Sequence, residues 1–176
     1  MLATSVYMIV FRVIHILAAI AWGGSVFMIV VFLQPTAKAV GMAAGPFMRE
    51  LLGVRKVTDR IIGLGWITII AGGFLYWHDW HLYASFGDFF GSAFGLTLTI
   101  GAIAALIAVD IGMFATRPAL QRSLSLGAQI AQAGDPPPSE LLQALAATQA
   151  RARMLAKWNL AFIAIAAFAM STARYW

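Results

Sequence analysis

The chain has 176 residues, of which 61% are hydrophobic and 11% are charged, whereas soluble globular domains carry roughly 25% charged residues. Its formal net charge is +5 and it contains no cysteine, which excludes disulfides, iron–sulfur clusters and thiolate metal sites. The basic residues gather in two loops beside apolar stretches, a pattern that indicates a lipid bilayer as the partner and not a nucleic acid.

Four apolar stretches approach the length of about 20 residues that a helix needs to cross a bilayer. They cover residues 6–33, 60–77, 90–115 and 158–173. The first stretch lacks the charged leader of a signal peptide, and we interpret it as a retained helix. We therefore predict an all-α membrane protein, a four-transmembrane-helix bundle that forms a single domain over residues 1–176.

The distribution of Lys and Arg predicts the orientation of this bundle. Five basic residues lie in or beside the connection 34–59 and five in the connection 116–157, whereas the connection 78–89 has none. Because basic loops stay in the cytoplasm, we expect an N-out, C-out topology. Aromatic residues follow the second span and close the fourth, as in an interfacial belt. They are Tyr76, Trp77, Trp80, Tyr83, Tyr175 and Trp176.

The long third connection is predicted to form a cytoplasmic helical hairpin over about residues 118–157. Apolar residues recur at helical spacing in 118–133 and again in 139–157, and the segment Gly134–Pro138 separates the two. We expect Ser139 to cap the second helix of the hairpin. In the first connection, residues 46–52 suit either a short helix on the membrane surface or a plain connector.

His15 is the strongest candidate for a functional residue, because an ionisable side chain deep inside a span is costly. Arg12 and Trp22 lie on the same helical face at offsets of three and seven residues. If His15 ligates a haem iron, Arg12 lies where a propionate would be paired. In the alternative interpretation, Arg12 extends to the lipid headgroups and His15 hydrogen-bonds a neighbouring helix.

His78 and His81 end the second span and are three residues apart, so both can point one way on a helix. Imidazole binds iron, copper and zinc, and a bis-histidine site with His15 is one interpretation. Membership of the aromatic belt is the other. The eight methionines are scattered along the chain, which favours packing over a copper cluster.

Other polar residues are expected to hold the bundle together. Asp59 and Asp110 lie near arginines at the cytoplasmic side and suggest ion pairs, and Asn159 suggests a hydrogen bond between helices. Glycines in the second and third spans allow close helix approach. They are Gly63, Gly65, Gly72, Gly73, Gly101 and Gly112.

The segment His15-Ile-Leu-Ala-Ala-Ile-Ala-Trp22-Gly23-Gly24, with Pro35 closing the helix, resembles the first helix of the CopD-like membrane family. It is also similar, more distantly, to the HemJ type of bacterial protoporphyrinogen oxidase. The resemblance implies a four-helix module of the bacterial inner membrane, associated with b-type haem or with copper uptake. His15 matches the first-helix histidine, which ligates haem in the HemJ type; the third span lacks that type's lysine.

These observations predict a haem b protein with metal ligands His15 and either His78 or His81, and with Arg12 and Trp22 beside the cofactor. Such a protein transfers electrons, with a membrane quinone as a candidate partner, and is a candidate membrane oxidoreductase. Copper handling by the same histidines is the first alternative. The second is an accessory subunit that binds a larger complex through the cytoplasmic hairpin.

Overall fold

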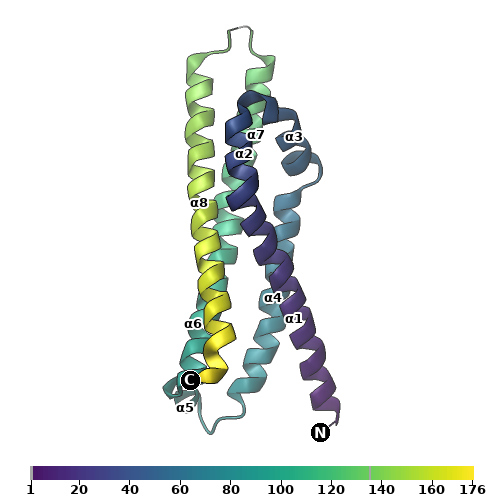
Figure 1. Ribbon diagram of the computed structural model, residues 1–176, viewed down its shortest axis with the longest axis vertical. Helices are drawn as coiled ribbons and strands as arrows, with labels where there is room; N and C mark the ends of the chain where they lie inside the picture. Colours follow the sequence, from purple (N-terminus) through teal and green to yellow (C-terminus); the bar gives the residue numbers. More distant parts are fainter. Residues whose placement is uncertain (1, 135) are drawn as a thin grey trace.

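The structure is a computed structural model that describes residues 2–134 and 136–176. In these residues every regular element is a helix, and four long helical segments run roughly along one axis (Figure 1). All four are long and apolar enough to cross a membrane. The all-helical class is therefore confirmed, with four helices that are long and apolar enough to span a membrane.

The first segment is one continuous helical arm followed by a compact turn. α1 (Leu2–Met28) passes through a wide π-helical turn (Ile29–Leu33) into α2 (Gln34–Val40). Gly41 has φ +65°, a backbone conformation that glycine adopts readily, and the chain turns back there. The short helix α3 (Gly45–Arg49) and a second π-helical turn (Glu50–Val54) follow. The helix expected at 46–52 is thus present, as two shorter elements.

The second segment, α4 (Val57–Trp80), leads into a short helical turn and the third segment. α5 (Phe86–Gly91) precedes α6 (Ala93–Asp110), and the side chains of Ser85 and Ser92 cap these two helices. Ser92 is extended, so the third span begins at residue 93 and not at 90 as predicted. Phe89 of α5 is fully buried against the rings of Tyr76 in α4 and Tyr83 in the connection.

The third and fourth segments form the predicted hairpin. α6 continues through a π-helical turn (Ile111–Thr116) into α7 (Arg117–Gln132), which packs along α8 (Ser139–Thr172). The prediction that Ser139 caps α8 is wrong, because the cap is Pro138 and no side chain bonds the helix end. Pro138 precedes the first helical residue with an extended backbone, and its carbonyl oxygen accepts hydrogen bonds from the N–H groups of Leu141 and Leu142. Asp135, in the predicted turn, lies outside the described residues.

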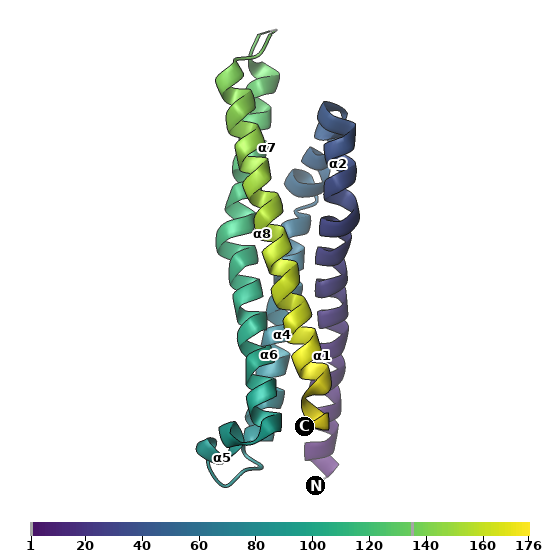
Figure 2. The same ribbon diagram turned by 60° about the vertical axis from the view of Figure 1, so that its left-hand side comes forward.

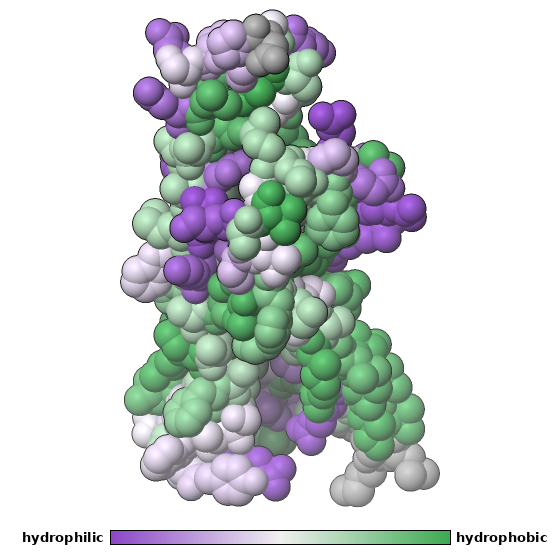
Figure 3. Space-filling model, turned by 45° about the horizontal axis from the view of Figure 1, so that its top comes forward, coloured by the Kyte–Doolittle hydropathy of each residue, from purple (hydrophilic) through white to green (hydrophobic). Residues whose placement is uncertain are grey.

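Two pairs of helices build the bundle, since α1 packs chiefly on α4 and α6 chiefly on α8. Small residues fill the centre, where Ala104, Ala105 and Ala108 surround the large side chains of Trp22 and Val109. Many large apolar side chains point outward instead. Hydrophilic residues are most frequent toward the hairpin end, in the upper part of Figure 3. A continuous apolar surface of this kind fits contact with lipid.

The two helical pairs diverge toward the hairpin end of the molecule. Figure 2 shows α2 standing apart from α7 and α8. At the opposite end α1 stays beside α4 and α6 beside α8, while Figure 1 shows the start of α1 apart from α6 and α8. The three π-helical turns, at residues 29–33, 50–54 and 111–116, all lie in the diverging part. Such turns widen a helix locally and recur at functional sites.

Candidate functional site

His15 lies in the contact between α1 and α4 and is held by the backbone of α4. Its Nδ1 lies 2.8 Å from the carbonyl oxygen of Thr68. A carbonyl oxygen only accepts, so Nδ1 carries the proton and Nε2 keeps its lone pair in the neutral ring. The imidazole rests on Gly72, where a Cβ atom would lie 2.7 Å from Cε1 of His15. The hydrogen bond to a neighbouring helix, which the alternative interpretation of His15 predicts, is thus present.

Arg12 lies one turn from His15, toward the start of α1, and is exposed. Asp79 of α4 is partly buried, and Arg12 and His78 are the basic residues whose charges act on its carboxylate, although no ion pair joins them in the described residues. Asp79 follows Gly72 by seven residues and Thr68 by eleven, so these three residues share one face of α4. We call Arg12, His15, Thr68, Gly72 and Asp79 the histidine seam.

His78 and His81 do not face His15 across this seam. His78 follows Gly72 by six residues, which is about 9 Å along a helix axis and a different helical face. His81 is exposed, and its Nδ1 bonds the carbonyl oxygen of Trp77 in its own helix at 2.7 Å. Its ring stacks against Trp77 and Trp80, a position that suits the aromatic belt.

Trp22 lies two turns further along α1, inside the core. It is 4% exposed and packs against Gly65, where a Cβ atom would lie 3.0 Å from Cε2 of the indole. Its role in the structure is therefore helix packing. Gly65, Gly72, Gly101 and Gly112 do meet neighbouring side chains as expected, whereas Gly63 and Gly73 face open space.

Within the described residues, no group of three or more His, Asp or Glu side chains converges to hold a metal ion. The chain matches no protein-family model, and comparison with curated proteins and with solved structures finds no similar protein. The function must therefore be argued from the geometry of the site.

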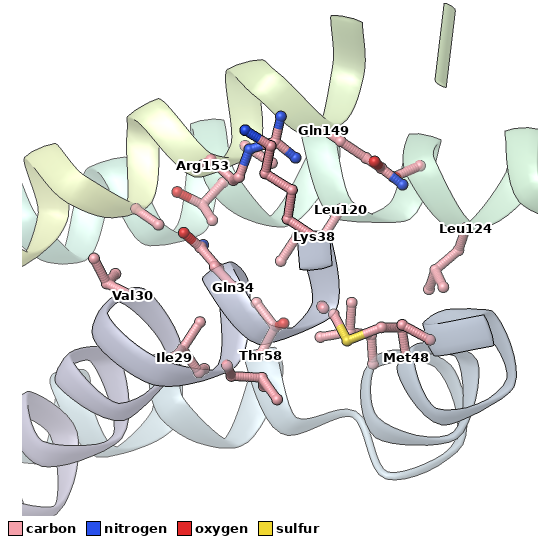
Figure 4. A pocket seen from close by; sticks show the side chains of 18 of the residues that line it. Ile29, Val30, Gln34, Lys38, Met48, Thr58, Leu120, Leu124, Gln149 and Arg153 are labelled. Atoms are coloured by element: carbon pink, nitrogen blue, oxygen red, sulfur yellow. The ribbon is translucent and has the colours of Figure 1, made fainter. Parts of the chain in front are cut away.

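A large cavity opens where the helical pairs diverge, and we call it the hairpin cleft. It has a volume of about 720 Å³ and lies between the arm formed by α2 and α3 and the hairpin formed by α7 and α8 (Figure 4). Its lining extends along α8 from Asn159 to Leu145, fourteen residues or about 21 Å of helix. The sequence-based prediction placed the candidate site at the end of the bundle that carries His78 and His81, and it did not reveal this cleft.

The deep end of the cleft contains polar groups in an apolar wall. Asn159 is 6% exposed, and its Nδ2 donates to the carbonyl oxygen of Ala108 at 2.9 Å. This is the helix-to-helix hydrogen bond predicted for Asn159. Its Oδ1 and the hydroxyl of Thr116 are both buried without a hydrogen-bond partner, and both residues line the cleft. The predicted ion pair at Asp59 is also present, with Arg117 Nε 2.6 Å from Oδ1.

Proposed function

We propose that this protein is a multi-pass membrane protein that binds b-type haem through His15 and carries electrons in the membrane. The observation that supports the proposal is the hydrogen bond from His15 Nδ1 to the carbonyl oxygen of Thr68. Ligating histidines usually donate their other ring nitrogen to such a group, which fixes the tautomer and leaves Nε2 for the metal. The bound haem would supply one-electron chemistry.

Two features beside His15 support this proposal. Gly72 presents backbone instead of a side chain to the imidazole, so the ring can lie against α4 with its Nδ1 on Thr68. Arg12 is exposed one turn away and would hold a propionate. We propose His15 alone as protein ligand, because His78 lies about 9 Å along the axis of α4 from Gly72, the residue that the imidazole of His15 contacts.

We also propose that the histidine seam faces the outside of a bacterial inner membrane and the hairpin faces the cytoplasm. Lys and Arg gather around α2, α3, α7 and the first half of α8, whereas the connection from α4 to α5 has none. α8 spans 34 residues, about 51 Å, so it extends about 20 Å beyond the hydrocarbon core.

Cysteine labelling tests this orientation, since the chain has no cysteine of its own. Ala84 and Gln132 are exposed in the connection after α4 and at the end of α7, respectively. A membrane-impermeant maleimide should label Ala84→Cys in intact cells and Gln132→Cys only after permeabilisation. The reverse pattern would overturn the orientation.

Absorption spectra of the protein purified after haem-replete expression test haem binding. We expect a Soret band, and α and β bands after reduction with dithionite. His15→Ala should abolish them. His81→Ala should keep them, because His81 bonds its own helix. A wild-type protein without a Soret band, or a His15→Ala variant with an unchanged spectrum, contradicts the proposal. Circular dichroism of each variant verifies that the helices form.

A further inference from the structure

The hairpin cleft carries an unbalanced charge. Its lining includes three cationic residues, Lys38, Arg49 and Arg153, and no Asp or Glu. Figure 4 shows Lys38 from α2 reaching across the cleft toward Arg153 of α8. In the described chain neither residue forms an ion pair, because the ion pairs there are Arg55 with Glu50 and Arg117 with Asp59. Cations that line one cleft with no acidic residue among them favour an anionic ligand.

The buried polar atoms at the deep end are a second, independent indication of a ligand. Oδ1 of Asn159 and the hydroxyl of Thr116 have no partner in the described residues, and a buried polar atom without a hydrogen bond is costly. Both residues line the same cleft as the cations. Both atoms are closed off from the cleft as they stand, so a ligand with ester or hydroxyl oxygens would satisfy them once these side chains turn toward it.

The cleft has the size of a site for part of a lipid. Its volume is about 720 Å³, and small-molecule sites have volumes of about 300–1,000 Å³. A cavity with apolar walls and a cationic rim fits a molecule with one acidic end and a long apolar part.

The position of the cations along α8 matches the headgroup level of a membrane. Lys157 and Trp158 are exposed between Arg153 and Asn159, and such residues anchor helices at the interface. Arg153 precedes Asn159 by six residues, about 9 Å along the axis. Basic pockets between spanning helices at this level bind acidic lipid headgroups.

We propose that the hairpin cleft binds one anionic glycerophospholipid from the adjoining leaflet. Its phosphate lies between Lys38 and Arg153, its glycerol and ester region lies near Thr116 and Asn159, and an acyl chain extends along the wall toward Trp22. The inference is independent of haem binding, because the cleft shares no residue with the histidine seam.

Native mass spectrometry of the full chain, released from nanodiscs, tests this site. The nanodiscs contain phosphatidylcholine with a minority of phosphatidylglycerol. We expect one phosphatidylglycerol per chain, enriched over its share of the bilayer. The double variant Lys38→Gln with Arg153→Gln should lower this retention about tenfold or more, because it removes two charge-assisted contacts.

The matched control is Arg122→Gln with Arg151→Gln, which removes the same charge from α7 and α8 at exposed residues outside the cleft lining. It should retain phosphatidylglycerol like the wild type. Equal retention of both lipids, equal loss in both double variants, or a protein partner or second copy in place of lipid would each overturn the proposal. Circular dichroism verifies that both double variants fold.

Discussion

The histidine seam and the hairpin cleft lie toward opposite ends of one bundle and treat polar groups in opposite ways. In the seam, the imidazole of His15 bonds the backbone of α4. In the cleft, the cations have no carboxylate among the lining residues. The seam thus pairs its histidine within the protein, whereas Lys38 and Arg153 of the cleft form no ion pair in the described residues.

The largest effect on stability is expected from filling the space at Gly65, the position on α4 where α1 and α6 approach closely. At Gly65 a Cβ atom would lie 2.6 Å from Val109 and 3.0 Å from Trp22, so Gly65→Val overpacks the core. It should destabilise the fold by about 1–3 kcal/mol, measured by thermal unfolding in detergent. Gly63→Val is the control, because no atom lies within 4 Å of that position. Equal melting temperatures would show that α4 does not pack as described.

An intermediate effect is expected from displacing the imidazole within the seam. Gly72→Ala places a methyl group only 2.7 Å from Cε1 of His15, so the ring should shift and lose its hydrogen bond to Thr68. We expect a loss of about 1 kcal/mol and a weaker or shifted Soret band. Gly73→Ala, with nothing within 4 Å, should leave both unchanged. A Gly72→Ala variant with wild-type stability and spectrum contradicts the geometry of the seam.

A smaller effect on stability is expected in the cleft, where the amide of Asn159 has a hydrogen bond at Nδ2 but none at Oδ1. Asn159→Leu removes the bond to Ala108 but also removes the unpartnered Oδ1. The loss and the gain oppose each other, so stability should change by less than about 1 kcal/mol. Thermal unfolding in lipid-free detergent measures this. A loss as large as that of Gly65→Val would show that Oδ1 has a partner within the protein.

The smallest effect is expected from the ion pair between Arg117 and Asp59. Their side chains are 42% and 41% exposed, so water and salt screen the attraction. A double-mutant cycle of Arg117→Gln and Asp59→Asn should give a coupling energy of a few tenths of a kcal/mol, reduced further at high salt. A large coupling that does not depend on salt would indicate a buried pair instead.

Much of the fold follows from the sequence, because it depends on patterns within single helices. Hydropathy predicts the four long helices, and the turn-forming segment before Ser139 predicts the hairpin. An ion pair at Asp59 follows from its position near arginines at one end of the bundle, and its partner proves to be Arg117. These features need no knowledge of how far apart the helices lie. The ion pair expected at Asp110 is absent from the described residues.

The candidate sites were less predictable, because they depend on distances between helices. The partner of His15 is a backbone carbonyl, which no residue type reveals. The spacing of Thr68, Gly72 and Asp79 along one face of α4 was the available signal. The cleft arises where wide π-helical turns and the positive φ of Gly41 redirect the chain, and Lys38 and Arg153 are more than a hundred residues apart in sequence.

The two helices of the hairpin differ in mechanical character. α8 contains neither glycine nor proline over its 34 residues, so it is a stiff rod with one end at the hairpin and the other at the C-terminal end of the bundle. The helical segment beside it is interrupted by a π-helical turn between α6 and α7, and Pro118 follows that turn. Bending within the hairpin is therefore expected at the π-helical turn and Pro118, beside a partner helix that stays straight.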